Sequence, residues 1–100
     1  MAYRIEFTDD AREHLRRLTA RDGATLLAAL RQTLRHEPKR QTRNRKRLRA
    51  NPLAPWVLRV RHLRAYYGVS EWPEPIVTVR AIGIKLRERV LVGGLEIDLS

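Results

Sequence analysis

The sequence contains no cysteine. This absence excludes a disulfide framework, a thiolate nucleophile and a zinc site built from cysteines. The chain also has no secretory leader pattern at its N-terminus and no apolar run long enough to span a bilayer. We therefore expect a cytoplasmic protein without a membrane partner. His14 and His36 have no neighbour at metal-ligand spacing, so we expect both on the surface and predict neither a metal nor a cofactor.

Acidic residues are scarce. The chain has 11 aspartates and glutamates against 21 lysines and arginines, which gives a net charge of +10, and no acid lies between Glu37 and Glu71. Such a balance favours a polyanionic partner, meaning nucleic acid, an anionic membrane surface or an acidic protein. The membrane surface is the weakest of the three, because the expected helices carry no aromatic anchor.

The N-terminal third predicts one strand followed by two helices. Residues 3–7 alternate apolar and polar side chains, as a half-buried strand does. Thr8 is a suitable N-cap for a helix over about residues 9–20. Asp22 and Gly23 predict a break, and a second apolar stripe predicts a helix over about residues 24–36, ended by Pro38. The short link between the helices predicts an antiparallel hairpin.

The C-terminal half predicts strands only. Residues 56–61, 64–69, 76–84 and 90–92 are strand-like, and residues 95–99 are consistent with an extended tail. One hundred residues suffice for a single domain, residues 1–100. We therefore predict an α+β fold: a twisted, mainly antiparallel sheet in the order β-α-α-β-β-β, with a possible further strand. The helical hairpin should cover one face of this sheet.

Residues 39–49 form a basic run in which seven of eleven residues are lysine or arginine. For charge runs in general, a solvated and mobile loop is the commoner interpretation. The density of this run, and the strands that follow it, raise the odds of anion binding. Its candidate anion-binding residues are Arg43, Arg45, Lys46, Arg47 and Arg49.

The segments NPLAPWVLRVRHLRAYYGV (residues 51–69) and VTVRAIGIKLRERVLVGG (residues 77–94) resemble the RelE/ParE superfamily of bacterial type II toxins. The shared pattern is a basic segment RKRLR, an aromatic residue, an apolar and basic strand, an arginine before a tyrosine-bearing strand, and a strand ending in Ile-Gly-x-Lys. The opening YRIEFTDDAREHLRRL is also similar to the family's first strand and helix. The resemblance covers nearly the whole chain and implies a RelE-like fold.

The resemblance also implies a function. RelE-type toxins cut messenger RNA in the ribosomal A site without a metal, whereas ParE-type toxins poison DNA gyrase and cut nothing. In both branches a cognate antitoxin, typically acidic, covers the toxin. We therefore expect an mRNA interferase with an acidic antitoxin as partner. A gyrase inhibitor and a plain RNA-binding module remain open as alternatives.

The family pattern implies that Arg59 and Arg64 stabilise the phosphate, that Lys85 is the basic residue after Ile-Gly, and that Tyr67 is the functional aromatic. Arginine is a poor proton-transfer group. The groups that could move protons are Lys85, Lys46, His62, Tyr66, Tyr67 and Glu88.

Strand geometry indicates which side chains share one face of the sheet. Arg61 and Arg80 join Arg59 and Arg64 as candidate anion-binding residues, because several like charges on one small sheet face repel each other without an anionic partner. Alternation along the strand places Tyr66, rather than Tyr67, on the face of Arg64. Alternation and the family pattern thus disagree about which tyrosine is functional.

Overall fold

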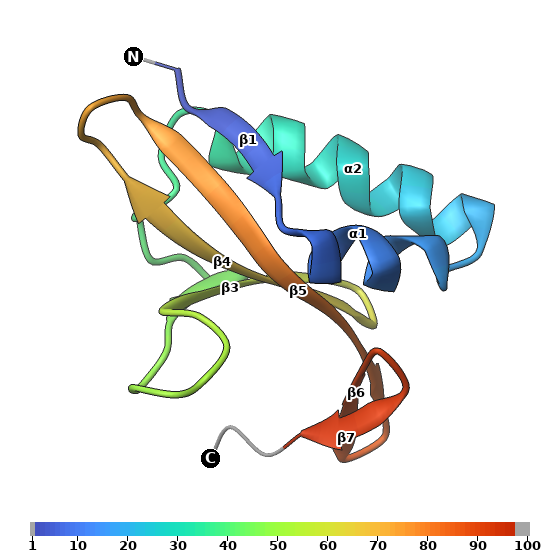
Figure 1. The fold of residues 1–100 in the computed structure, drawn as a ribbon. Helices are drawn as coiled ribbons and strands as arrows, with labels where there is room; N and C mark the ends of the chain where they lie inside the picture. The colour runs from blue at the N-terminus through green and yellow to red at the C-terminus, as the bar shows by residue number, and fades with distance from the viewer. Residues whose placement is uncertain (1, 98–100) are drawn as a thin grey trace.

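The computed structural model describes residues 2–97 and shows a small α+β domain with two helices and a seven-stranded, mainly antiparallel sheet (Figure 1). The elements follow one another as β1 (Arg4–Phe7), α1 (Asp9–Arg16), α2 (Ala20–Leu34), β2 (Arg45–Arg47), β3 (Trp56–Val60), β4 (Leu63–Ser70), β5 (Ile76–Leu86), β6 (Arg89–Val92) and β7 (Leu95–Ile97). No helix among these residues is long and apolar enough to cross a membrane.

Strand β5 is the longest strand, and it organises the sheet. The strands lie in the order β2-β3-β4-β5-β6-β7. Strand β4 pairs antiparallel along one edge of β5. On the other edge, β1 pairs in parallel with residues 76–79 and β6 pairs antiparallel with residues 83–86. The N-terminal strand and the C-terminal hairpin therefore share one edge of the same strand.

The predicted strand count was too low. Strand β2 lies within the basic run, and β7 lies within the segment expected to be a tail. Both have only three residues, and β2, with the sequence RKR, has no apolar alternation. A strand of three residues is too short to show an alternating pattern in the sequence. It forms because it pairs with a neighbouring strand. The sequence of β1 likewise does not indicate that this strand pairs in parallel with β5.

The predicted break between the helices was misplaced. Helix α1 ends at Arg16, and Thr19 begins α2 by accepting a hydrogen bond from the backbone N–H of Asp22 at 3.1 Å. Asp22 and Gly23, expected to break the chain, instead lie in the first turns of α2. An acidic residue there is favoured by the helix dipole, so Asp-Gly is compatible with a helix start as well as with a turn.

The two faces of the sheet differ in cover. Both helices lie on one face (Figure 1), over a core that includes Leu26, Leu30, Trp56, Leu58 and Tyr67. On the opposite face, here called the open face, no helix of residues 2–97 lies. Its smaller buried cluster consists of Ala54, Val57, Tyr66, Ala81 and Val92, with Leu48, Leu53, Val90 and Ile97 packed against it. The open face is therefore available for side chains that act on a partner.

Helix α1 fills the gap that β1 and β6 leave on the edge of β5. Between these two strands, the hydroxyl of Thr8 donates to the carbonyl of Arg80 at 3.1 Å. The backbone N–H of Ile82 donates to Nδ1 of His14 at 3.1 Å. His14 is thus a half-buried structural acceptor, and the prediction of a surface histidine was wrong. Burial is the main cause that lowers the pKa of its imidazole.

This arrangement predicts an acid-sensitive fold. Because the folded state lowers the pKa of His14, its contribution to stability is present above the ordinary histidine pKa of about 6.5 and is lost as pH falls through the lowered value. The contribution should be about 1 kcal/mol, the usual value of one hydrogen bond. Denaturant unfolding across pH 4 to 8 measures it. His14→Asn, which keeps an acceptor but cannot titrate, should flatten this limb, whereas the control His36→Asn should leave it unchanged. An unaltered limb in His14→Asn would show that another group is responsible.

Candidate active site on the open face

A hollow of about 320 Å³ lies on the open face, between the end of β2 and the C-terminal hairpin. Strands β3, β4 and β5 form its floor. The nine residues that line it are Leu48, Val57, Arg59, Arg64, Tyr66, Lys85, Glu88, Val90 and Ile97. The structure thus brings together three of the four residues predicted to be catalytic, and we call this hollow the central pocket.

Arg59 and Arg64 are direct neighbours in the antiparallel pairing of β3 with β4. Side chains in such a pair begin about 5 Å apart at their Cβ atoms, so like charges there repel each other. The Nη1 group of Arg64 donates to the carbonyls of Arg61 and Leu63, both at 2.8 Å. Arg61 lies in the left-handed region, with φ 57°, in the tight turn between the strands. This turn therefore holds the guanidinium of Arg64 in a fixed place.

The electrostatics of the central pocket favour an anion. Burial, and then the like charge of Arg59, lower the pKa of Arg64. Burial raises the pKa of Tyr66, and Arg64 and Arg59 oppose that shift. Among residues 2–97, Arg59, Arg64 and Lys85 form no ion pair with an acid. A phosphate between these groups would relieve their mutual repulsion.

Lys85 and Glu88 bring two groups capable of proton transfer to the same pocket. Lys85 is near the end of β5, and its backbone N–H donates to the carbonyl of His62 at 2.7 Å. The two-residue turn from β5 to β6 then places Glu88 at the pocket rim, with Arg87 in the left-handed region at φ 58°. Glu88 is the one carboxylate among the residues that line this hollow.

The two adjacent tyrosines lie on opposite faces of the sheet. Tyr66 lines the central pocket and is only 3% exposed. Tyr67 is fully buried on the helix side, where its hydroxyl donates to the carbonyl of Pro38 at 2.6 Å and its ring stacks on Trp56. Tyr67, which the family pattern favours, is therefore not part of the pocket. Strand alternation with Arg64 was the signal that identified Tyr66.

Two of the candidate anion-binding residues of the basic run, Arg45 and Arg47, have contacts within the fold. The Nη1 group of Arg45 donates to the carbonyl of Thr33 at 3.1 Å and to that of Glu37 at 2.6 Å. It thereby serves the C-terminal end of α2, where carbonyls lack helical partners. The guanidinium of Arg47 lies 5.7 Å from the ring centroid of Trp56, which is cation–π geometry. The structure therefore gives Arg45 a structural place rather than one in the central pocket.

The other predicted basic residues do not line the central pocket. Arg43, Lys46, Arg49, Arg61 and Arg80 are all exposed. Lys46 pairs with Val57 at the edge of the open face. Arg61 borders a separate hollow beside Thr42 and Asn44. Arg49 and Arg80 lie together at a further hollow next to the central pocket.

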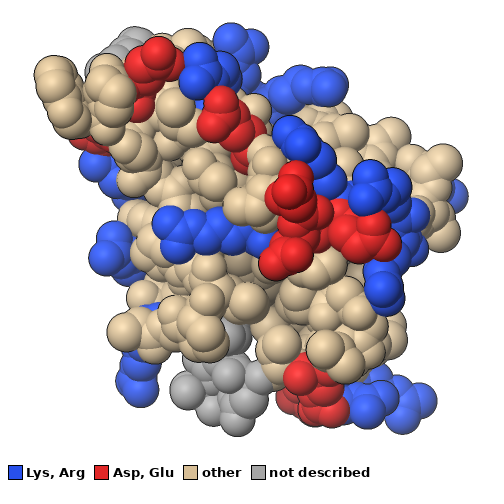
Figure 2. Space-filling view, in the orientation of Figure 1, with Lys and Arg blue, Asp and Glu red and all other residues tan. Residues whose placement is uncertain are grey.

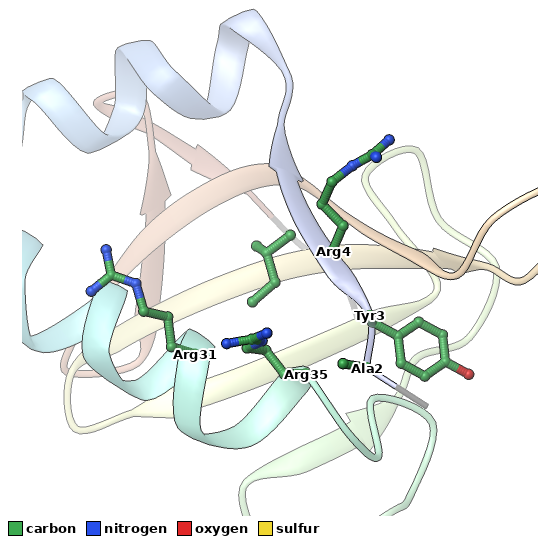
Figure 3. Close-up of a pocket in the computed structure, with 6 residues that line it drawn as sticks. Ala2, Tyr3, Arg4, Arg31 and Arg35 are labelled. Atoms are coloured by element: carbon green, nitrogen blue, oxygen red, sulfur yellow. The ribbon is translucent and has the colours of Figure 1, made fainter.

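A fourth hollow, of about 380 Å³, lies between β1 and α2 and carries a different set of groups (Figure 3). Arg31 and Arg35 extend from α2 toward it, and Arg4 extends from β1. Arg4 is paired with Glu6 and Glu74. No histidine, lysine or carboxylate lines this hollow. It therefore lacks the combination of phosphate-binding and proton-transfer groups that the central pocket has.

Charge is distributed unevenly over the molecule. In the view of Figure 2, acidic side chains lie next to basic ones. Several ion pairs of the helices join residues one helical turn apart, such as Arg16 with Glu13 and Arg12 with Asp9. Because acids on the helical side are paired in this way, the basic residues of the open face contribute an uncompensated positive charge.

Within residues 2–97, no group of three or more histidine or acidic residues could hold a metal ion.

The sequence matches no protein-family model and no curated protein. The features of the molecule that bear on its function are therefore the geometry of the central pocket and the motifs of the sequence.

Proposed function

We propose that this protein is a RelE-like toxin, an mRNA interferase that acts on ribosome-bound message and is neutralised by a cognate antitoxin. The observation that carries the proposal is the direct opposition of Arg59 and Arg64 in a pocket that also contains Lys85 and Glu88. Two guanidinium groups held against each other need an anion between them, and a planar guanidinium suits the oxygens of a phosphate.

The pocket supports cleavage of RNA by its own 2′-hydroxyl. The 2′-oxygen forms a bond to the adjacent phosphorus, and the bond from phosphorus to the 5′-oxygen of the next nucleotide breaks. The 2′ proton passes to the carboxylate of Glu88, and the ammonium of Lys85 gives a proton to the departing 5′-oxygen. Arg59 and Arg64 stabilise the charge that develops on the phosphate. The products are a 2′,3′-cyclic phosphate and a 5′-hydroxyl end.

Tyr66 has a positioning role in this proposal. Its ring forms part of the pocket wall, together with Val57 and Val90. Tyr66 and Val57 are each only 3% exposed, so they form a closed floor of the pocket and offer no free ring face for a stacked base. This floor supports the neighbouring pair of Arg59 and Arg64, against which the scissile phosphate lies in this proposal. Such orientation brings the reacting atoms together before the chemical step.

The proposed antitoxin is an acidic protein that covers the open face. The net charge of +10 supports an acidic partner. The apolar part of the pocket lining consists of Leu48, Val57, Val90 and Ile97. It supports a partner that also buries apolar side chains in the pocket. Occupation of this pocket would exclude RNA from Arg59 and Arg64, which explains neutralisation.

The test is induced expression in a bacterium, followed by pulse labelling of protein and DNA and by primer extension on an abundant message. We expect protein synthesis to stop and new in-frame cuts to appear in translated RNA. Glu88→Gln should lose the cuts if its carboxylate accepts the 2′ proton. Arrest of DNA synthesis with intact message would instead support a gyrase inhibitor, and no effect on either would support a plain RNA-binding module.

A further inference from the structure

A second hollow lies next to the central pocket on the open face. It has a volume of about 250 Å³, and its lining includes Arg47, Arg49, Asn51 and Arg80. Leu48 lines both this hollow and the central pocket, so the two are neighbours. Lys85, Glu88 and Tyr66, the groups of the central pocket that are capable of proton transfer, do not line this hollow. The hollow is therefore suited to binding a ligand and not to catalysing its cleavage.

Arg80 reaches this hollow because residue 68 is a glycine. A Cβ atom built on Gly68 would lie 2.7 Å from Nη2 and 3.0 Å from Cζ of Arg80. The guanidinium thus lies across the backbone of β4, in the space that any other side chain would occupy. Glycine allows such close approach because it has no side chain. The position of Arg80 is therefore set by the sheet and differs from that of a freely extended surface arginine.

The backbone of Arg80 is also fixed. The register of β4 with β5 shifts between Tyr66 and Tyr67, which pair with Ala81 and Val79, so Arg80 is the extra residue of a β-bulge. Bulges re-aim a side chain and recur beside functional sites. The carbonyl of Arg80 accepts the hydroxyl of Thr8, and the carbonyl of Val79 accepts the N–H of Thr8. This bulge is therefore held by the start of α1.

The loop that carries Arg49 is braced as well. Nδ2 of Asn51 donates to the carbonyls of Arg49 and Ala54, at 2.7 and 2.9 Å. Oδ1 of Asn51 accepts from the N–H groups of Leu53 and Ala54. Neither Arg49 nor Arg80 forms an ion pair within residues 2–97. Arg80, with a positioned guanidinium, and Arg49, on a braced backbone, thus border one hollow, and within residues 2–97 neither is neutralised by an acid.

We infer that Arg80 and Arg49 form a subsite for a phosphodiester group of single-stranded RNA, beyond the nucleotide that is cut. This inference rests on the function proposed for the central pocket. Along β4, Gly68 is four residues from Arg64, which corresponds to about 13 Å at about 3.3 Å per residue. A dinucleotide in the central pocket would not reach the subsite, whereas a longer strand would extend to it. The subsite therefore makes affinity depend on the length of the RNA.

The experiment measures binding of two uridine oligonucleotides, a dinucleotide by NMR titration and an octanucleotide by fluorescence anisotropy at several salt concentrations. Arg80→Gln should weaken the octanucleotide about fivefold to tenfold and lower its salt slope by about 0.7, the value for one phosphate contact on a single strand. Binding of the dinucleotide should not change. Arg21→Gln on α2 removes the same charge from an exposed residue and should affect neither ligand.

Gly68→Ala tests the position of the guanidinium. The added methyl group meets the flexible end of the Arg80 side chain, so the fold should survive while the guanidinium moves. We expect the same loss as in Arg80→Gln, and no additional loss when the two are combined, because both remove one interaction. Additive losses would overturn the inference that Gly68 acts through Arg80.

Three further results would decide against the subsite or against its chemistry. An equal loss for the dinucleotide would place Arg80 in the central pocket. An equal effect of Arg21→Gln would reduce the subsite to general attraction by net charge. Normal binding of an octadeoxynucleotide by Arg80→Gln would show that the 2′-hydroxyl, and not the phosphate, is recognised. The function of the central pocket is tested separately, because Arg64→Ala should weaken the dinucleotide whether or not the subsite exists.

Discussion

Arg64→Ala should lower the rate of RNA cleavage on the ribosome by about 100- to 1,000-fold, the usual cost of removing one group that stabilises a transition-state charge. The guanidinium of Arg64 is fixed by the carbonyls of Arg61 and Leu63 and faces Arg59 across the strand pair. Primer extension on translated message with purified ribosomes and the purified protein measures the rate. Arg21→Ala on α2 is the matched control, because it removes the same charge from an exposed residue that does not line the central pocket.

The control variant should keep most of the activity. Circular dichroism should show an unchanged fold in both variants, since neither side chain belongs to the buried core. Lys85→Ala should resemble Arg64→Ala, because Lys85 lines the same pocket and is proposed to protonate the leaving oxygen. If Arg64→Ala and Lys85→Ala both cut RNA normally, the central pocket is not the catalytic site.

Tyr67→Ala should destabilise the protein by about 3–5 kcal/mol, the usual cost of truncating a buried aromatic residue. A domain of this size has a total stability of about 5–15 kcal/mol, so the variant should be largely or partly unfolded. Tyr67→Phe should cost only about 1 kcal/mol, because it removes the hydrogen bond to Pro38 and keeps the stacking on Trp56. Denaturant unfolding measures both.

The milder variant also tests the function that the family pattern implies for Tyr67. Tyr67→Phe should cut RNA normally, since its hydroxyl faces the helix side of the sheet. Loss of cleavage by a stable Tyr67→Phe protein would mean that this hydroxyl reaches the substrate, in conflict with its burial. The pKa of Tyr67 is raised by burial, which disfavours the ionised form of its hydroxyl.

Elements that repeat a period could be predicted from the sequence. Strand β3 has apolar residues at every second position, β5 is rich in β-branched residues, and the apolar stripe with Leu27, Leu30 and Leu34 predicted α2. The short strands β2 and β7 could not be predicted, because three residues hold too little of a period. The start of α2 at Ala20 was not predicted. Thr19 acts as an N-cap only when the residues after it form a helix, and Asp22 and Gly23 were interpreted as a break.

The sequence by itself determined the excess of positive charge, the α+β order and the sharing of one face by Arg59, Arg64 and Tyr66, because charge and alternation are local properties. Only the tertiary structure decided which basic residues remain available. Arg45 contacts α2, and His14 contacts β5, through partners far away in the chain. The tertiary structure also placed Glu88 beside Lys85 and Arg80 over Gly68. Such contacts depend on strand register and on tight turns, which no single segment of sequence encodes.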